Sequence, residues 1–144
     1  MARQALNQTK ITVLSRSSNE SYARVAVAAF AAQLDPTVEE LNDLKTAVSE
    51  AVTNCIVHAY PDTIGPIYIT VSLFEEGLVQ IRIRDKGRGI DDVKRAMEPL
   101  YTTGGEERAG LGFAVMESFT DKLRVRSTPY KGTTVTMEKV IRCR

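Results

Sequence analysis

The chain has 144 residues, enough for one domain to bury a hydrophobic core without disulfide or metal cross-links. Its 19 Lys and Arg residues nearly balance its 18 Asp and Glu residues, so no overall field attracts nucleic acid or an anionic membrane. There is no Trp, and the five Tyr and four Phe are scattered, which excludes a row of aromatics for stacking bases.

The two cysteines, Cys55 and Cys143, have a spacing that suits neither a zinc site nor a disulfide framework. We interpret both as free thiols, which are typical of a reducing compartment. The N-terminal residues lack the apolar segment of a secretory signal, and no stretch approaches the roughly 18 apolar residues of a membrane span. These features predict a single cytoplasmic domain over residues 1–144.

The first predicted elements are a strand and a helix. Apolar residues alternate over residues 10–14, which predicts a short strand. Ser17 and Glu20 have the spacing of a capping box, in which two side chains bind the first N–H groups of a helix. We therefore expect an Ala-rich helix from residue 18 to residue 34.

A second helix is predicted over residues 38–59, and Thr37 with Glu40 has the capping-box spacing at its start. With residues placed 100° apart, its apolar side chains fall within an arc of roughly 140°, which we expect to face the core. They are Val38, Leu41, Leu44, Val48, Val52, Cys55, Ile56 and Ala59.

The other side of this helix carries a polar stripe made of Glu50, Asn54 and His58. Steps of four residues place these side chains on one line along the helix. The helix therefore faces a core with one side and something polar with the other. On these residues alone, a solvated helix face is an equal alternative.

The rest of the chain predicts an antiparallel sheet. Residues 67–73 and 79–83 alternate apolar with polar side chains across a tight connection, which predicts a hairpin. A short helix near residues 91–97 and a helix over residues 111–119 follow, and a second hairpin over residues 123–137 closes the sheet. This order predicts an α+β two-layer sandwich, with helices on one face of a mostly antiparallel mixed sheet.

A glycine motif, Asp85-Lys-Gly87-Arg-Gly89-Ile90, directly follows a predicted strand. Its glycines would let a flat ligand lie on bare backbone, while the carboxylate accepts a hydrogen bond. An adenine amine suits such an acceptor. The same pattern also occurs in ordinary turns.

A second glycine motif, Gly110-Leu111-Gly112, lies at the start of the predicted helix over residues 111–119. Free N–H groups at a helix N-terminus bind anions, and glycines let phosphate oxygens approach them. A flexible linker is the alternative interpretation. The segment near residues 98–110 exceeds the usual length of a connection, which makes it a candidate lid.

Together, and in this order, the motifs resemble the Bergerat ATP-binding family, which includes gyrase and the histidine kinases. They are the Glu/Asn/His helix, Asp-x-Gly-x-Gly, Gly-x-Gly before a helix, and Gly132-Thr133 at the start of a strand. Within this family, nearly the whole chain resembles the bacterial anti-sigma serine kinases. The stretches that carry this resemblance are residues 20–30, 33–37, 48–54 and 99–103.

The resemblance implies a homodimeric protein serine kinase that uses ATP and Mg²⁺, releases ADP, binds a sigma factor and phosphorylates an anti-anti-sigma protein. Asn54 would coordinate Mg²⁺, and Glu50 would act as the general base. Arg108 would be the lid arginine that contacts the γ-phosphate. His58 would orient its neighbours, and Arg24 would contact protein partners.

The resemblance also assigns the nucleotide contacts, with Asp85 at the adenine amine and Thr133 supporting it through a hydroxyl or water. The positions expected to contact the nucleotide are Asn54, Asp85, Gly87, Gly89, Ile90, Thr103, Arg108, Gly110, Leu111, Gly112 and Thr133. One departure is that two glycines follow Thr103, without the family's usual Lys. We expect this change to weaken γ-phosphate binding or to speed nucleotide exchange.

Three alternatives accompany this prediction. The ATP lobe of a histidine kinase would need a separate phosphoacceptor, and the only His of the chain is His58, inside the nucleotide motif. A nucleotide-binding anti-sigma module without phosphotransfer would not need both Glu50 and Asn54. A general-stress anti-sigma kinase would use the same chemistry in a different regulatory circuit.

Overall fold

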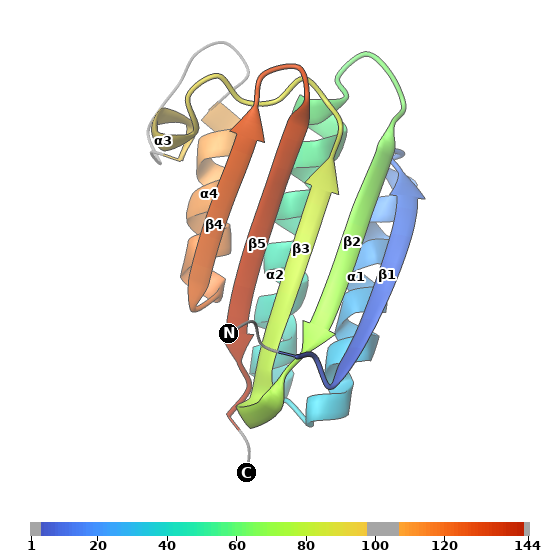
Figure 1. Cartoon of the computed structure of the whole chain (residues 1–144), viewed down its shortest axis with the longest axis vertical. Coiled ribbons are helices and arrows are strands. Elements are labelled where there is room, and N and C mark those ends of the chain that lie inside the picture. The colour runs from blue at the N-terminus through green and yellow to red at the C-terminus, as the bar shows by residue number, and fades with distance from the viewer. Residues whose placement is uncertain (1–3, 98–106, 143–144) are drawn as a thin grey trace.

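The protein folds as two layers, a five-stranded sheet with the helices on one face (Figure 1). The structure, a computed structural model, describes residues 4–97 and 107–142, without the side chains of residues 95 and 107–111. The predicted α+β sandwich is confirmed. Every strand pairing among the described residues is antiparallel, so the mixed pairing that the prediction included is not found there.

The sheet contains β1 Asn7–Leu14, β2 Pro66–Leu73, β3 Leu78–Asp85, β4 Lys122–Thr128 and β5 Gly132–Val140. The α-helices are α1 Ser18–Ala31, α2 Val38–Asn54, α3 Val93–Ala96 and α4 Glu107–Phe119. Short turns of other helix types are η1 Ala32–Leu34, η2 Cys55–Ala59 and η3 Glu75–Gly77. Across the sheet the strands follow the order β1-β2-β3-β5-β4, so β3 lies at the centre.

The alternation of side chains along the strands builds the core. Ile69 on β2 pairs with Ile83 on β3, which pairs with Val135 on β5, and all three are buried against the helices. Arg82 and Arg84, which alternate with these apolar positions, are exposed. Because side chains alternate between the two faces of a strand, this register confirms the predicted hairpin between β2 and β3.

Helix α2 packs against both α1 and α4, which also lie on the covered face of the sheet (Figure 1). Most of its predicted apolar arc is confirmed, since Leu44, Val48 and Val52 are buried. Val38 is 76% exposed, so its prediction as a core residue is wrong. As the first residue of α2, Val38 precedes the part of the helix that packs on the sheet.

The two predicted capping boxes have different outcomes. At the start of α2, Glu40 N donates to Thr37 Oγ1 at 3.0 Å, and Thr37 N donates to Glu40 Oε1 at 2.9 Å, as predicted. At the start of α1, Ser17 has helical backbone angles and its side chain makes no capping bond. A capping residue normally has extended angles, so the capping box predicted for Ser17 is wrong.

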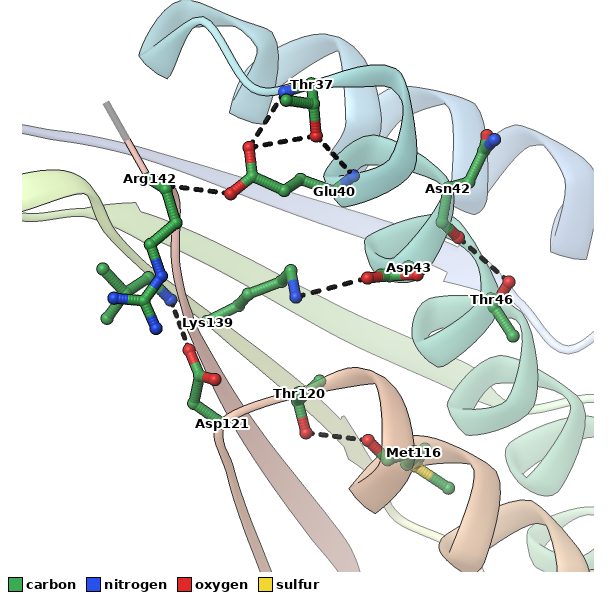
Figure 2. A network of polar contacts seen from close by, with 11 residues as sticks. Thr37, Glu40, Asn42, Asp43, Thr46, Met116, Thr120, Asp121, Lys139 and Arg142 are labelled. Carbon is green, nitrogen blue, oxygen red and sulfur yellow. Dashed lines mark hydrogen bonds and ion pairs between the residues drawn. The ribbon is translucent and has the colours of Figure 1, made fainter. Parts of the chain in front are cut away.

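The start of α2 is also joined to the end of the last strand (Figure 2). Arg142 N donates to Glu40 Oε2 at 2.8 Å, and Lys139 Nζ lies 3.4 Å from Asp43 Oδ2. Glu40 thus accepts a hydrogen bond from the helix start with Oε1 and one from the chain after β5 with Oε2. These contacts fix the end of α2 that is remote from Glu50 and Asn54.

Two helix boundaries differ from the prediction. The regular part of α2 ends at Asn54, and the chain continues as the π-turn η2, in which Tyr60 N donates to Cys55 O at 3.1 Å. Helix α4 begins at Glu107 rather than at residue 111. The glycines at residues 110 and 112 suggested a later start, but α4 packs along α2, and such packing overrides weak helix propensity.

None of the helices in the described part of the chain combines the length and apolarity that a membrane crossing requires.

Replacing Thr37 with Ala should lower the free energy of unfolding by about 1 kcal/mol, because Glu40 N loses its acceptor at the helix start. In a chain of this size, that loss corresponds to roughly 2–4 °C in melting temperature. Ser17→Ala is the matched control and should stay within about 0.5 kcal/mol of the parent. Urea denaturation measures all three proteins, and equal losses in both variants would contradict this assignment.

Candidate functional site

A cavity of about 180 Å³ lies between the end of α2, the end of β3 and the start of β5. These elements meet at the upper end of the sheet in Figure 1. The cavity brings together residues that are far apart in the sequence, from Ala51 to Val135. Among the residues singled out from the sequence, its lining includes Asn54, His58, Asp85, Gly89, Ile90 and Thr133.

Asp85, the last residue of β3, is only 5% exposed, and its carboxylate is held by backbone groups. Its Oδ1 accepts from Gly87 N at 2.9 Å and from Thr133 N at 3.2 Å. Burial raises the pKa of Asp85, while the hydrogen bonds from Gly87, Thr133 and Cys55 act in the opposite direction. Asp85 is therefore a buried acceptor at the wall of the cavity.

The segment after Asp85 is shaped by a glycine and a hydroxyl pair. Gly89 has a φ of +74°, and a Cβ there would lie 2.3 Å from Thr128 O, so a larger residue does not fit. Ile90 N donates to Ser127 Oγ at 2.8 Å, and Ser127 Oγ lies 2.8 Å from Thr133 Oγ1. Ser127 thus joins the two cavity segments by hydrogen bonds, a role that no sequence pattern indicated.

The π-turn at the end of α2 holds the segment after Asp85 from the other side. Ala59 O accepts from Arg88 N at 3.2 Å. Tyr60 Oη accepts from Lys86 N at 2.6 Å and donates to Pro66 O at 2.7 Å. The helix end and the glycine segment are therefore joined by hydrogen bonds.

The polar stripe of α2 faces α4 at a glycine. A Cβ built on Gly112 would lie 3.2 Å from Glu50 Oε2 and 3.2 Å from Asn54 Oδ1, so the absence of a side chain makes room for both groups. Asn54 Nδ2 is buried without a hydrogen-bond partner in the part of the chain that the structure describes. An unpaired buried donor costs about 1–3 kcal/mol, which a polar ligand at this position would offset.

Glu50 and Asn54 thus occupy neighbouring turns of α2, with Asn54 in the wall of the cavity and Glu50 one turn beyond it. Both are partly buried, as is His58 on the following turn. The solvated-face alternative does not describe Glu50 and Asn54, because both lie against Gly112 of α4. The role of His58 in orienting its neighbours remains a prediction.

The structure describes the lid residues only in part. Thr103 lies outside the described residues, as does Cys143. Arg108, Gly110 and Leu111 belong to the first turns of α4, and only their backbone is described. In an α-helix that begins at Glu107, the N–H groups of Leu111 and later residues bond to carbonyls of the preceding turn, so the free N–H groups lie nearer the helix start.

Arg24 lies on α1, away from the cavity lining. Its Nη1 is 3.4 Å from Glu20 Oε1 and 3.4 Å from Ser49 Oγ, and Ser49 Oγ also donates to Glu20. The Arg24 side chain is 38% exposed, so it is accessible, and its partners lie on both α1 and α2. Its predicted contact with a protein partner stays a prediction.

Nine residues of the cavity lining were not predicted from the sequence as site residues, among them four that come from three different elements and one turn. Cys55 stood in the apolar arc of the second helix and was assigned to the core, where it is indeed buried. Phe113, Tyr130 and Val135 also line the cavity. Phe113 directly follows the second glycine motif, which was the one available signal. Tyr130 is otherwise largely exposed.

Residues 15–139 match the family model of the histidine kinase-like ATPase domain. The anti-sigma F factor of Caldanaerobacter subterraneus subsp. tengcongensis is 57% identical over 136 residues, which cover 94% of each chain. The anti-sigma F factor of Priestia megaterium is 52% identical over 135 residues, which cover 92% of each chain.

The chain belongs to the histidine kinase-like ATPase family, in its anti-sigma F factor branch. A solved structure supports the fold: the RsbU and RsbW domains of Rv1364c from Mycobacterium tuberculosis superpose with a TM-score of 0.69 at 19% identity, over 96% of this chain and 34% of that one. The histidine kinase domain of Erythrobacter litoralis EL346 superposes with a TM-score of 0.58 at 19% identity, over 85% of this chain and 60% of that one. Membership in this ATPase family implies ATP binding.

Replacing Asp85 with Asn should weaken ADP binding by about 10- to 100-fold, because a charged acceptor is lost. The pKa of Asp85 is higher in the folded chain than in the unfolded chain, so folding favours the protonated carboxyl. The contribution of Asp85 to the free energy of unfolding therefore falls as the pH rises from the unfolded pKa to the folded pKa. At pH 7 the neutral amide should therefore not lower the free energy of unfolding without ligand.

Titration calorimetry with ADP and urea denaturation at pH 7 measure the two effects. Asp62→Asn, in an exposed loop, is the matched control and should change neither. An Asp85→Asn variant that binds ADP as the parent does would contradict the assignment.

Proposed function

We propose that the chain is an ATP-dependent protein serine kinase that also binds and inhibits the sporulation sigma factor sigma F. It phosphorylates a serine of the anti-anti-sigma protein that antagonises it. The observation that carries this proposal is the placement of Glu50 and Asn54 side by side opposite Gly112, next to the cavity that contains Asp85. Relatives at 52–57% identity that are anti-sigma F factors support the same conclusion.

In this proposal the adenine lies in the cavity and donates its amine to Asp85, while Gly89 and Ile90 line the face of the base. Gly87 and Thr133 hold the carboxylate, and the Thr133 hydroxyl lies close to the base. The phosphates extend toward Asn54 and the start of α4. There the N–H groups in the first turn of α4 donate hydrogen bonds to the phosphate oxygens, and Arg108 and Thr103 also contact the phosphates.

Asn54 is the residue that would hold Mg²⁺. The described residues contain no group of three or more His, Cys, Asp or Glu side chains that could hold a metal ion. Mg²⁺ is commonly bound through one or two protein oxygens together with phosphates and waters, so a single carboxamide fits its chemistry. When bound, Mg²⁺ neutralises charge on the phosphates.

Glu50 is the proposed general base. Its carboxylate lies one turn from Asn54 and faces Gly112 of α4. It accepts the hydroxyl proton, or holds the hydroxyl in line with the γ-phosphorus. Phosphoryl transfer has a loose transition state, so positioning and charge neutralisation contribute more than proton removal.

The protein partners contact a different surface in this proposal. Arg24 is accessible on α1 and is held by Glu20 and Ser49, which suits a fixed contact with a partner. The chain acts in the cytoplasm as a homodimer that holds sigma F in its ATP-bound state. The kinase of a general-stress circuit is the closest alternative, and the anti-sigma F factor relatives favour the sporulation circuit.

Replacing Glu50 with Gln should abolish transfer of labelled phosphate to the anti-anti-sigma protein, while ATP affinity stays near that of the parent. The carboxamide keeps the size of the side chain but accepts no proton. Glu39→Gln, on an exposed position of the same helix, is the matched control and should retain transfer. Equal transfer rates in Glu50→Gln and parent would remove the general-base role and favour a binding module.

Replacing Asn54 with Ala should remove the increase in ADP affinity that Mg²⁺ provides, because the carboxamide ligand is lost. Calorimetric titration with ADP, with Mg²⁺ and with a chelator, separates this effect from loss of the nucleotide pocket. A variant whose affinity still rises on adding Mg²⁺, by the same factor as in the parent, would assign the metal to another residue.

A further inference from the structure

Tyr130 lies in the turn between β4 and β5, at the upper end of the sheet in Figure 1. It lines the cavity that contains Asp85, yet it is 87% exposed, more than any other large apolar residue in the described part of the chain. A residue that lines a cavity and is so exposed lies at its opening. Among the described residues, no cation lies over the ring of Tyr130, whereas Arg84 lies 4.8 Å from the ring centroid of Tyr68.

The backbone of Tyr130 has a conformation that tyrosine seldom adopts. Its φ is +61°, in the left-handed region that glycine favours and that Asn and Asp tolerate. Lys131 N donates to Thr128 O at 3.0 Å, so Tyr130 is the third residue of a four-residue turn, directly after Pro129. Proline at the second position and a positive φ at the third are typical of a type II turn, whose third residue is normally Gly or Asn. A tyrosine at this position therefore costs stability relative to Asn.

The turn is held against the wall of the cavity. Tyr130 N donates to Arg88 O at 2.6 Å, in the segment after Asp85. At the end of the turn, a Cβ on Gly132 would collide with Asp85 O, so the two backbones are in direct contact. The backbone of Tyr130 thus has a defined position at the opening, and its left-handed conformation is part of that position.

We propose that Tyr130 contacts the base of the bound nucleotide, with its ring covering the purine at the opening of the cavity. This inference rests on the proposed function. Aromatic side chains stack on bases through their flat faces, whichever base is present. Gly89 and Ile90 line the cavity from the segment after Asp85, and Tyr130 lines it from the turn between β4 and β5. The base is therefore contacted from two separate segments.

The left-handed tyrosine supports a ligand contact because strained residues are concentrated at ligand-binding sites. Asn or Gly would suit the turn better, but neither presents a flat ring. Among the described residues other than glycine, a positive φ occurs at Asp35, Glu76 and Tyr130. Asp tolerates this conformation. Glu76, with a φ of +64°, precedes β3, whereas the cavity lies at the end of β3, so Glu76 is a matched control.

The test replaces Tyr130 with Asn and measures the melting temperature without ligand and the ADP affinity by titration calorimetry. Tyr130→Asn should raise the melting temperature by about 2–4 °C, because Asn tolerates the left-handed backbone. It should weaken ADP binding by about 5- to 10-fold, because the contact between ring and base is lost. Tyr130→Phe keeps the ring and should bind ADP as the parent does. Glu76→Asn should raise the melting temperature similarly and leave the ADP affinity unchanged.

A second measurement detects the contact directly. Tetranitromethane nitrates accessible tyrosine rings, and peptide mapping reports the extent of reaction at each position. Saturating ADP should protect Tyr130 from nitration. Tyr22, which is 55% exposed on α1 and does not line the cavity, should react equally with and without ADP.

A Tyr130→Asn variant that binds ADP as the parent does, or equal nitration of Tyr130 with and without ADP, would overturn the ring contact and leave the nucleotide site intact. An equal loss of affinity in Tyr130→Phe and Tyr130→Asn would also overturn it, because the effect would then belong to the hydroxyl. If the parent binds no ADP, the proposed function fails, and this inference fails with it.

Discussion

A buried carboxylate at the end of the central strand is the constraint on which the site depends. Asp85 is removed from water, so its oxygens need donors from the protein. Those donors come from the segment after β3, from the start of β5 and from the end of α2. Satisfying one side chain therefore brings three distant parts of the chain together, and the cavity lies where they meet.

Helix α2 carries the second half of the site, and both of its ends are fixed. Its start is capped by Thr37 and joined through Glu40 to the backbone of Arg142. Its end unwinds into a π-turn, and Ala59 O bonds to the segment after Asp85. Such π-turns are frequent at functional sites. With both ends held, the carboxamide of Asn54 has a defined position relative to Asp85.

Local patterns predicted the parts of this architecture that depend on neighbouring residues. Alternation along the strands identified the hairpins, and the Thr37 capping box was recognised because its partners are three residues apart. The same spacing failed at Ser17, whose helical backbone angles turn its side chain away from the free N–H groups. The bond between Cys55 and Asp85 joins residues 30 positions apart, and no periodicity reports such a contact.

The central claim is that a nucleotide binds with its base at Asp85 and its phosphates between Asn54 and the start of α4. The most direct measurement is a crystal structure of the chain with Mg²⁺ and ADP. The account predicts the adenine in the cavity, with its amine within hydrogen-bonding distance of Asp85 Oδ2 and the metal at the Asn54 carboxamide. ADP bound elsewhere, for instance on the exposed face of the sheet around Arg82 and Arg84, would contradict it.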